Sequence, residues 1–246
     1  MCNEQEINQA IAELGTFESR QSLTNDWRFK QTNKIWNRLG LNASRRVGSV
    51  MAMIDNLKPK TYLEWQYYYL SFRKDNFNEV IPFEHEAEIL AQYAQLDFAT
   101  AIRYAFHRVL DQTYQGYINE QNAITEIRAW LKKYAPQSCY IVEHANGYYD
   151  RVLGIDVRIW WINPKDNKAY EICGIQLKPK SFLQPQKNWF ADADRQNKTK
   201  QIKYAQTVHA PAYYWFYEDL QQEKKPMLSV KADGTPVSLL SNLQAA

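Results

Sequence analysis

The stretch GIDVRIWWINPKDNKAYEICGIQLKPKSF, residues 154–182, contains two apolar runs on either side of a polar turn, NPKDNK. Both runs are rich in β-branched and aromatic residues, so they predict the two strands of a hairpin. Side chains alternate between the two faces of a strand, so Gln176 and Lys178 project the same way and Glu171 projects away from them. Pairing across the turn can bring Asp156 of the first strand close to Gln176. Polar residues at sheet positions that are normally apolar often mark a functional site.

The residues around this hairpin predict a sheet flanked by helices. An amphipathic helix is expected over residues 119–135, with an inward face formed by Ile124, Ile127, Trp130 and Leu131. The segments that follow are expected, in chain order, as strands at 139–145, 151–163 and 169–179, a helix at 188–206 and a strand at 210–219. The predicted fold class is therefore α/β, with a mixed central sheet between helices.

The first half of the chain has a helical pattern. A helix is predicted in TYLEWQYYYLSF (61–72), where Thr61 followed by Glu64 has the spacing of a capping box. The apolar face of this helix is expected to hold Tyr62, Trp65, Tyr69 and Phe72. A period near 3.6 also predicts helical structure over residues 85–110. Because the pattern changes near residue 116, we divide the chain into a mainly helical region, 1–115, and a sheet-containing core, 116–246.

Composition limits the class of protein. Hydrophobic residues make up 45% of the 246 residues, which is enough for a packed core. The three Cys have no metal-type spacing and the four His are scattered, so a zinc site is not expected. The N-terminus shows no basic region followed by an apolar stretch, and no run approaches the roughly 18 apolar residues of a membrane span. We expect a reduced, cytoplasmic protein without a membrane segment.

The polar residues of the hairpin suit phosphodiester hydrolysis. The Asp156 carboxylate, the Gln176 amide oxygen and the Leu177 backbone carbonyl are hard oxygen ligands of the kind that Mg²⁺ prefers. A neighbouring Lys178 could orient or deprotonate a water and stabilise charge on a phosphate oxygen. The alternative is a buried Asp156–Lys178 pair that only ties two strands together.

This arrangement resembles the PD-(D/E)XK nuclease core over about residues 119–220, with Ile155–Asp156 in place of the Pro-Asp pair and Gln176–Lys178 in place of (D/E)XK. The Pro is replaced by Ile and the second acid by Gln, which leaves one ligand neutral. The resemblance implies that the helix before the sheet contributes an acid, with Glu126 as the first choice and Glu120 as the second. The segments VGSVMAMI, LEWQYYY and GIQLKPKSF also resemble the MjaI-type restriction endonucleases, whose implied target is CTAG.

If the core cuts DNA, basic and amide side chains must hold the duplex and read it. Candidates come from the basic run between residues 25 and 46, from the end of the hairpin and from the helix that follows it. They are Arg28, Lys30, Gln31, Asn33, Lys34, Arg45, Arg46, Lys180, Arg195, Lys198, Lys200 and Lys203. The acidic segment 75–97 should lie away from DNA. A short palindromic target calls for a two-fold symmetric homodimer, to which the helical region would also contribute contacts.

The sequence thus predicts a Mg²⁺-dependent endonuclease that acts on double-stranded DNA, in the best case a type II restriction enzyme. A repair or recombination nuclease is a variant of this hypothesis. The alternative from another class is a nucleic-acid-binding protein without catalysis, in which Asp156 and Lys178 are structural.

Overall fold

The computed structural model describes residues 4–38, 50–75, 82–136, 139–145, 147–183, 189–226, 229–232 and 236–237. The chain divides into two compact units, Met1–Tyr117 and Ile118–Ala246. Helix α9 (Gln112–Tyr134) begins in the first unit and continues into the second. Among the described helices, none is long and apolar enough to cross a membrane.

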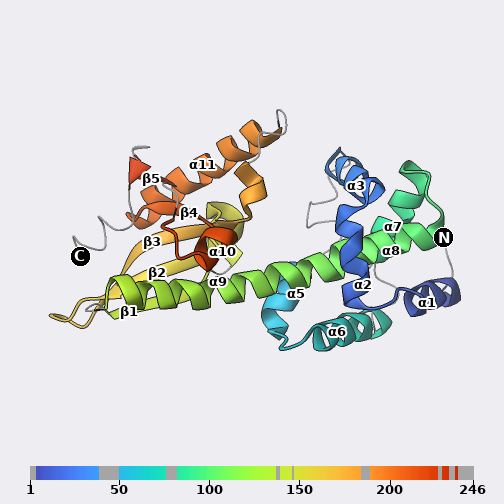
Figure 1. Cartoon of the computed structure of the whole chain (residues 1–246), viewed down its shortest axis with the longest axis horizontal. Helices are drawn as coiled ribbons and strands as arrows, with labels where there is room; N and C mark the ends of the chain where they lie inside the picture. Colours follow the sequence, from blue (N-terminus) through green and yellow to red (C-terminus); the bar gives the residue numbers. More distant parts are fainter. Residues whose placement is uncertain are drawn as a thin grey trace. The chain divides into compact units, whose positions relative to one another are not determined.

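The first unit is helical in its described parts (Figure 1). Its elements before α9 are α1 (Glu4–Ala12), α2 (Phe17–Gln21), the 3-10 helix η1 (Ser22–Asn25), α3 (Trp27–Arg38), α5 (Val50–Leu57), α6 (Tyr62–Asp75), α7 (Pro82–Tyr93), α8 (Phe98–Phe106) and the π-helix η2 (His107–Asp111). The helical prediction for the first half is confirmed.

Helix α6 begins at the predicted capping box. The Thr61 hydroxyl accepts the backbone N–H of Glu64 at 3.2 Å, and the Glu64 carboxylate accepts the backbone N–H of Lys60 at 2.8 Å. These bonds satisfy backbone donors that the first helical turn leaves without partners. Trp65 and Tyr69, on the predicted apolar face, are fully buried.

The helical segment predicted over residues 85–110 is interrupted between α7 and α8. Gln95 has a positive φ of 53°, and the Asp97 side chain caps α8 by accepting the Thr100 N–H at 2.8 Å. The spacing of the apolar residues does not reveal this break, because it continues with the same period across the turn. Tyr93, the last residue of α7, is 50% exposed.

The second unit contains the predicted mixed sheet. Its elements after α9 are β1 (Cys139–His144), α10 (Gly147–Leu153), β2 (Val157–Ile162), β3 (Ala169–Lys178), the 3-10 helix η3 (Lys180–Leu183), α11 (Trp189–Val208), β4 (Ala212–Phe216), α12 (Tyr217–Gln221), β5 (Ser229–Val230) and β6 (Pro236–Val237). The strand order in the main sheet is β1-β2-β3-β4, and only the β3–β4 pair is parallel. This confirms the α/β fold class.

The sheet lies between α9 and α11 (Figure 1). On one face, Ile127 and Trp130 of α9 pack in a single buried cluster with Ile159 of β2 and Ile175 of β3. This cluster includes the helix residues that the sequence predicted to face inward. On the other face, Tyr204 of α11 lies over β3. Helices α9 and α11 thus cover opposite faces of the sheet.

The segment 151–163, which we predicted as one strand, is a helix end followed by a shorter strand. Helix α10 ends at Leu153, and Gly154 takes a φ of +65°, with its N–H bonded to the Asp150 carbonyl at 3.0 Å. A glycine in this left-handed conformation commonly terminates a helix. The strand then starts at Val157, directly after Asp156.

Gly174 lies where β3 and α11 approach each other closely. A Cβ at this position would lie 2.7 Å from Cζ of Tyr204 and 2.9 Å from Cδ1 of Ile155. We expect Gly174→Ala to lower the free energy of unfolding by about 1–3 kcal/mol through overpacking. The matched control is Gly116→Ala in α9, where a Cβ would meet nothing within 4 Å. That variant should gain about 0.5–1 kcal/mol, and urea denaturation of both would show equal effects if the packing argument is incorrect.

Candidate active site

Asp156 is fixed by backbone and side-chain bonds where β1, β2 and β3 meet. Its N–H donates to the Ile175 carbonyl at 2.9 Å, and its carbonyl accepts the Ala145 N–H at 2.9 Å. Its carboxylate oxygen Oδ2 accepts the backbone N–H of Leu177 at 2.6 Å. The side chain is therefore held against the last residues of β3, as pairing across the hairpin predicted.

The surroundings of Asp156 disfavour its charged form. Burial raises the pKa of Asp156 to about 7. Lys178 and the Leu177 N–H act in the opposite direction, whereas the negative charges of Glu120 and Asp150 raise this pKa further. A bound cation would stabilise the charged form of this buried carboxylate, because it would compensate for the lost hydration.

Gln176 carries a buried acceptor without a partner. Its side chain is 4% exposed, and its Nε2 donates to Oδ1 of Asn197 in α11 at 3.5 Å. Its Oε1 has no hydrogen bond within the described residues. A buried amide oxygen left in this state costs about 1–3 kcal/mol, so such an atom suggests a missing ligand or water.

Lys178, at the end of β3, acts on the carboxylates of the site through its positive charge. It lowers the pKa of Asp156 and also that of Asp150. In the part of the chain that the structure describes, no ion pair joins Lys178 to either carboxylate. The described contacts therefore do not include the Asp156–Lys178 ion pair that a structural bridge would form.

The acid that α9 brings to this site is Glu120. Its charge acts on Asp156, and its Oε2 bonds to Nε2 of His144 at 2.7 Å. Glu126, our first choice from the sequence, lies six residues further along, about 9 Å in a regular helix and well off the same face. Burial raises the pKa of Glu126, and no interaction with Asp156 contributes. The structure thus brings together Asp156, Gln176, Lys178 and Glu120.

Two neighbours of the site, Asp150 and His144, were not among the sequence candidates. Burial raises the pKa of Asp150, the charge of Glu120 raises it further, and His144, Lys178 and Lys200 lower it. The sequence does not single out His144, because the four His residues are scattered along the chain. No spacing pattern predicts that Asp150 of α10 lies near Asp156, because the turn at Gly154 separates the helix from the strand.

Glu171 was expected to face away from the site because it is out of phase with Gln176; its partners do lie outside the site, but it shares a face of β3 with Gln176. Glu171 accepts the hydroxyl of Tyr204 at 2.7 Å, so it contacts α11, as Gln176 does through Asn197. The register between β2 and β3 shifts at Ile159/Trp160, and this irregularity reverses the alternation of side chains between residues 171 and 176. Glu171 binds Arg158 and Tyr204 rather than the site residues.

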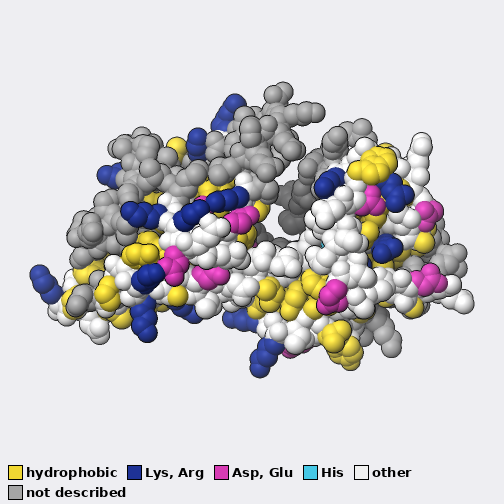
Figure 2. All heavy atoms as spheres, in the orientation of Figure 1, with side chains coloured by type: hydrophobic (Ala, Val, Ile, Leu, Met, Phe, Trp, Pro, Cys, Tyr) yellow, Lys and Arg dark blue, Asp and Glu magenta, His cyan; other side chains and the backbone are white. Residues whose placement is uncertain are grey.

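The basic candidates of the second unit lie on α11 and η3. On α11, Arg195, Lys198 and Lys203 are exposed, whereas Lys200 is half-buried, with its Cδ 3.1 Å from a Cβ placed on Gly154. Lys180 bonds through Nζ to Oδ1 of Asp219 at 2.7 Å. Figure 2 shows Lys and Arg side chains gathered on the visible face of this unit.

The basic candidates of the first unit are only partly described. Arg28 is exposed and pairs with Asp26 at 3.4 Å, and Lys30 and Gln31 are exposed on α3. The side chains of Asn33 and Lys34, and the whole of Arg45 and Arg46, lie outside the described residues. Arg20, which precedes this basic run, is 1% exposed and paired with Asp111, so its charge is not available to a polyanion.

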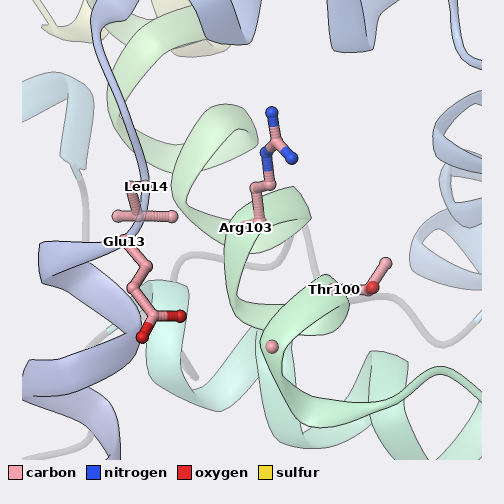
Figure 3. A pocket seen from close by; sticks show the side chains of 5 residues that line it. Glu13, Leu14, Thr100 and Arg103 are labelled. Atoms are coloured by element: carbon pink, nitrogen blue, oxygen red, sulfur yellow. The ribbon is translucent and has the colours of Figure 1, made fainter.

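No other described feature offers comparable chemistry. Among the described residues, no three His, Cys, Asp or Glu side chains are grouped to hold a metal ion by themselves. A depression of about 180 Å³ in the first unit is lined by Glu13, Leu14, Ala99, Thr100 and Arg103 (Figure 3). It holds one carboxylate, and Figure 3 shows the side chains of Glu13 and Arg103 pointing in different directions.

Comparison with known proteins identifies the family. No curated protein and no solved structure matches the chain. The model of the MjaI restriction endonuclease family matches residues 32–218, which is more than half of the 246 residues and includes every residue of the candidate site. The chain therefore belongs to the MjaI restriction endonuclease family.

Proposed function

We propose that this protein is a Mg²⁺-dependent, site-specific deoxyribonuclease of type II, with its active site at Asp156, Gln176, Lys178 and Glu120. Membership of a restriction endonuclease family implies a nuclease that acts on DNA. The observation that carries the assignment of the site is a buried carboxylate beside an unpartnered amide oxygen, close to a lysine that neither of them binds directly.

The donor atoms fit a hard divalent cation. Oxygen ligands would come from the carboxylates of Asp156 and Glu120, the unpartnered Oε1 of Gln176 and the Leu177 carbonyl. Such a set includes an amide and a backbone oxygen, so it does not require three acidic or His side chains. When bound, Mg²⁺ would supply positive charge for the phosphate and make a water more acidic.

The remaining chemistry falls to residues of this chain. Lys178 would orient the attacking water through its amine and stabilise the negative charge that develops on the phosphate oxygens. Asp156 is held in place by the Leu177 N–H, so it would keep its geometry through the reaction. His144 holds one oxygen of Glu120 and would thereby fix the direction of the other.

A palindromic target would be cut by a homodimer, because each strand requires its own active site. The family resemblance suggests CTAG as that target. Cleavage of a duplex oligonucleotide with one CTAG site, beside a duplex in which the site is scrambled, would test this choice directly.

The activity itself is tested with unmethylated plasmid and phage DNA. We expect discrete fragments with Mg²⁺ and intact DNA with EDTA. The Asp156→Asn variant, purified in the same way, controls for contaminating nucleases. Intact DNA over a broad set of sequences would contradict the proposal.

The exposed cations of α11 are proposed to hold backbone phosphates. Each such contact releases counterions, so replacing Lys198 and Lys203 by Ala should reduce the slope of log affinity against log salt by about 2. The control replaces Lys165 and Lys168, two exposed lysines of the turn between β2 and β3, by Ala. Equal slopes for the two double variants would remove α11 from the DNA interface.

A further inference from the structure

Helix α3 is held to the rest of the first unit by one face. The Phe29 ring lies 5.4 Å from the ring of Tyr104 and 5.1 Å from that of His107, edge to face in both cases. The Thr32 hydroxyl, one turn further along, accepts a hydrogen bond from the Arg108 guanidinium at 2.6 Å. Phe29 and Thr32 are almost fully buried. These contacts anchor α3 to α8 and η2 and decide which side of the helix faces outward.

The outward face of α3 carries an indole beside a cation and an amide. Trp27, Lys30 and Gln31 are three and four residues apart, so they share a face of the helix, opposite the anchored one. All three are exposed, and Trp27 is 65% exposed. Tryptophan is on average a highly buried residue, and indoles are enriched where proteins meet their partners. A single exposed apolar side chain is common, however, so its neighbours must decide what it contacts.

The charges around Trp27 favour a polyanion. The sequence of α3, WRFKQTNKIWNR, contains two Lys, two Arg and no Asp or Glu. Asp26, just before the helix, accepts the backbone N–H of Arg28 at 2.8 Å and the Tyr104 hydroxyl at 2.7 Å. Arg28 pairs with this carboxylate, so its charge is partly offset. Lys30 forms no ion pair within the described residues, so its charge remains on the outward face.

We propose that the face of α3 formed by Trp27, Lys30 and Gln31 contacts duplex DNA, with Lys30 at a backbone phosphate and the Trp27 indole against the bases. This inference rests on the proposed nuclease function, which makes duplex DNA the polyanion. The major groove admits an α-helix, its thymine methyl groups accept apolar contacts, and an amide can pair with an adenine edge. Residues 27–31 precede residue 32, where the family match begins, so the match assigns them no role.

The test measures binding of a duplex with one CTAG site at several salt concentrations, in EDTA so that the DNA stays intact. Trp27→Ala should weaken binding at least about 5-fold, the factor that corresponds to a weak base contact. The slope of log affinity against log salt should not change, because an indole carries no charge. Lys30→Ala should instead lower that slope by about 1. The control is Tyr67→Ala, which removes a 77% exposed aromatic side chain from α6 and should change neither quantity.

A second variant separates the aromatic contact from folding. Trp27→Phe keeps an apolar ring and should regain most of the affinity that Trp27→Ala loses, at the same melting temperature. The inference is overturned if Trp27→Ala binds as tightly as Tyr67→Ala, or if Trp27→Phe binds no better than Trp27→Ala. If wild-type protein cuts DNA while Trp27→Ala binds normally, only this role of α3 fails. If wild-type protein binds the duplex but cuts no DNA with Mg²⁺, the proposed function itself fails.

Discussion

Lys178→Ala is expected to lower the rate of DNA cleavage by at least about 100-fold, which is the lower end of what a positioned acid–base or charge-stabilising group contributes. Folding and DNA binding should stay close to wild type. Lys178 lies at the end of β3, is partly exposed and has no ion pair with Asp156 or Asp150 in the described residues. Its removal therefore breaks no buried bridge.

Lys168→Ala is the matched control, because Lys168 lies just before the start of the same strand and is exposed. Cleavage rates, melting temperatures and gel-shift affinities would be compared for both variants and wild type. A loss of about 3–5 kcal/mol of stability in Lys178→Ala would instead indicate a buried structural bridge. A normal cleavage rate would remove Lys178 from the catalytic machinery, whatever the stability of the variant.

Arg20→Met should produce the largest loss of stability, about 3–5 kcal/mol, because it leaves the buried Asp111 carboxylate without its cation. The guanidinium Nε donates to Oδ2 of Asp111 at 2.8 Å, and both side chains are almost fully buried. Tyr62 and His107 also bond to the same carboxylate. The pair therefore joins α2, α6 and η2 within the first unit.

Arg28→Met is the control, since it removes the same type of cation from an Arg–Asp pair at the surface. Arg28 is 56% exposed and lies 3.4 Å from Asp26, so its loss should cost at most about 1 kcal/mol. Denaturant unfolding at neutral pH would measure both variants. Similar losses at the two positions would show that burial does not set the strength of the Arg20–Asp111 pair.

The same network sets the pH dependence of the first unit. Burial would raise the pKa of Asp111, but the hydrogen bonds from His107, Arg20 and Tyr62 outweigh it, so the pKa lies below its ordinary value of 3.8. A carboxyl whose pKa is lowered on folding contributes stability above its unfolded pKa and loses it as the pH falls. The free energy of unfolding of the wild-type protein should therefore fall as the pH drops below the ordinary Asp pKa. In an Asp111→Asn variant, which lacks this titrating group, the fall should be smaller, and denaturant unfolding at several pH values would measure both.

Much of the fold could be predicted because it depends on local patterns. The alternation in the hairpin and its turn placed Asp156 beside the end of β3, and the 3.6-residue period identified the buried face of α9. These predictions need only the geometry of one strand or one helix. The family resemblance pointed to the same region, and the match over residues 32–218 agrees with it.

The sequence could not decide the remaining site residues, because they depend on tertiary contacts. Glu120 and Glu126 both lie on α9, and only the rotation of that helix against the sheet brings Glu120 to Asp156. Asp150 depends on the turn at Gly154, which the sequence suggested as part of a strand. The orientation of Glu171 depends on a shift in register that leaves no mark in the residue pattern.

Sequencing the ends of DNA fragments produced by the wild-type protein tests the central claim most directly. Unmethylated genomic DNA would be incubated with the protein and Mg²⁺, in parallel with Asp156→Asn and with EDTA. We expect the wild-type ends to fall at one short palindrome, at the same offset on both strands, and to be absent from both controls. Ends scattered over unrelated sequences, or equally frequent with Asp156→Asn, would contradict a site-specific nuclease centred on Asp156.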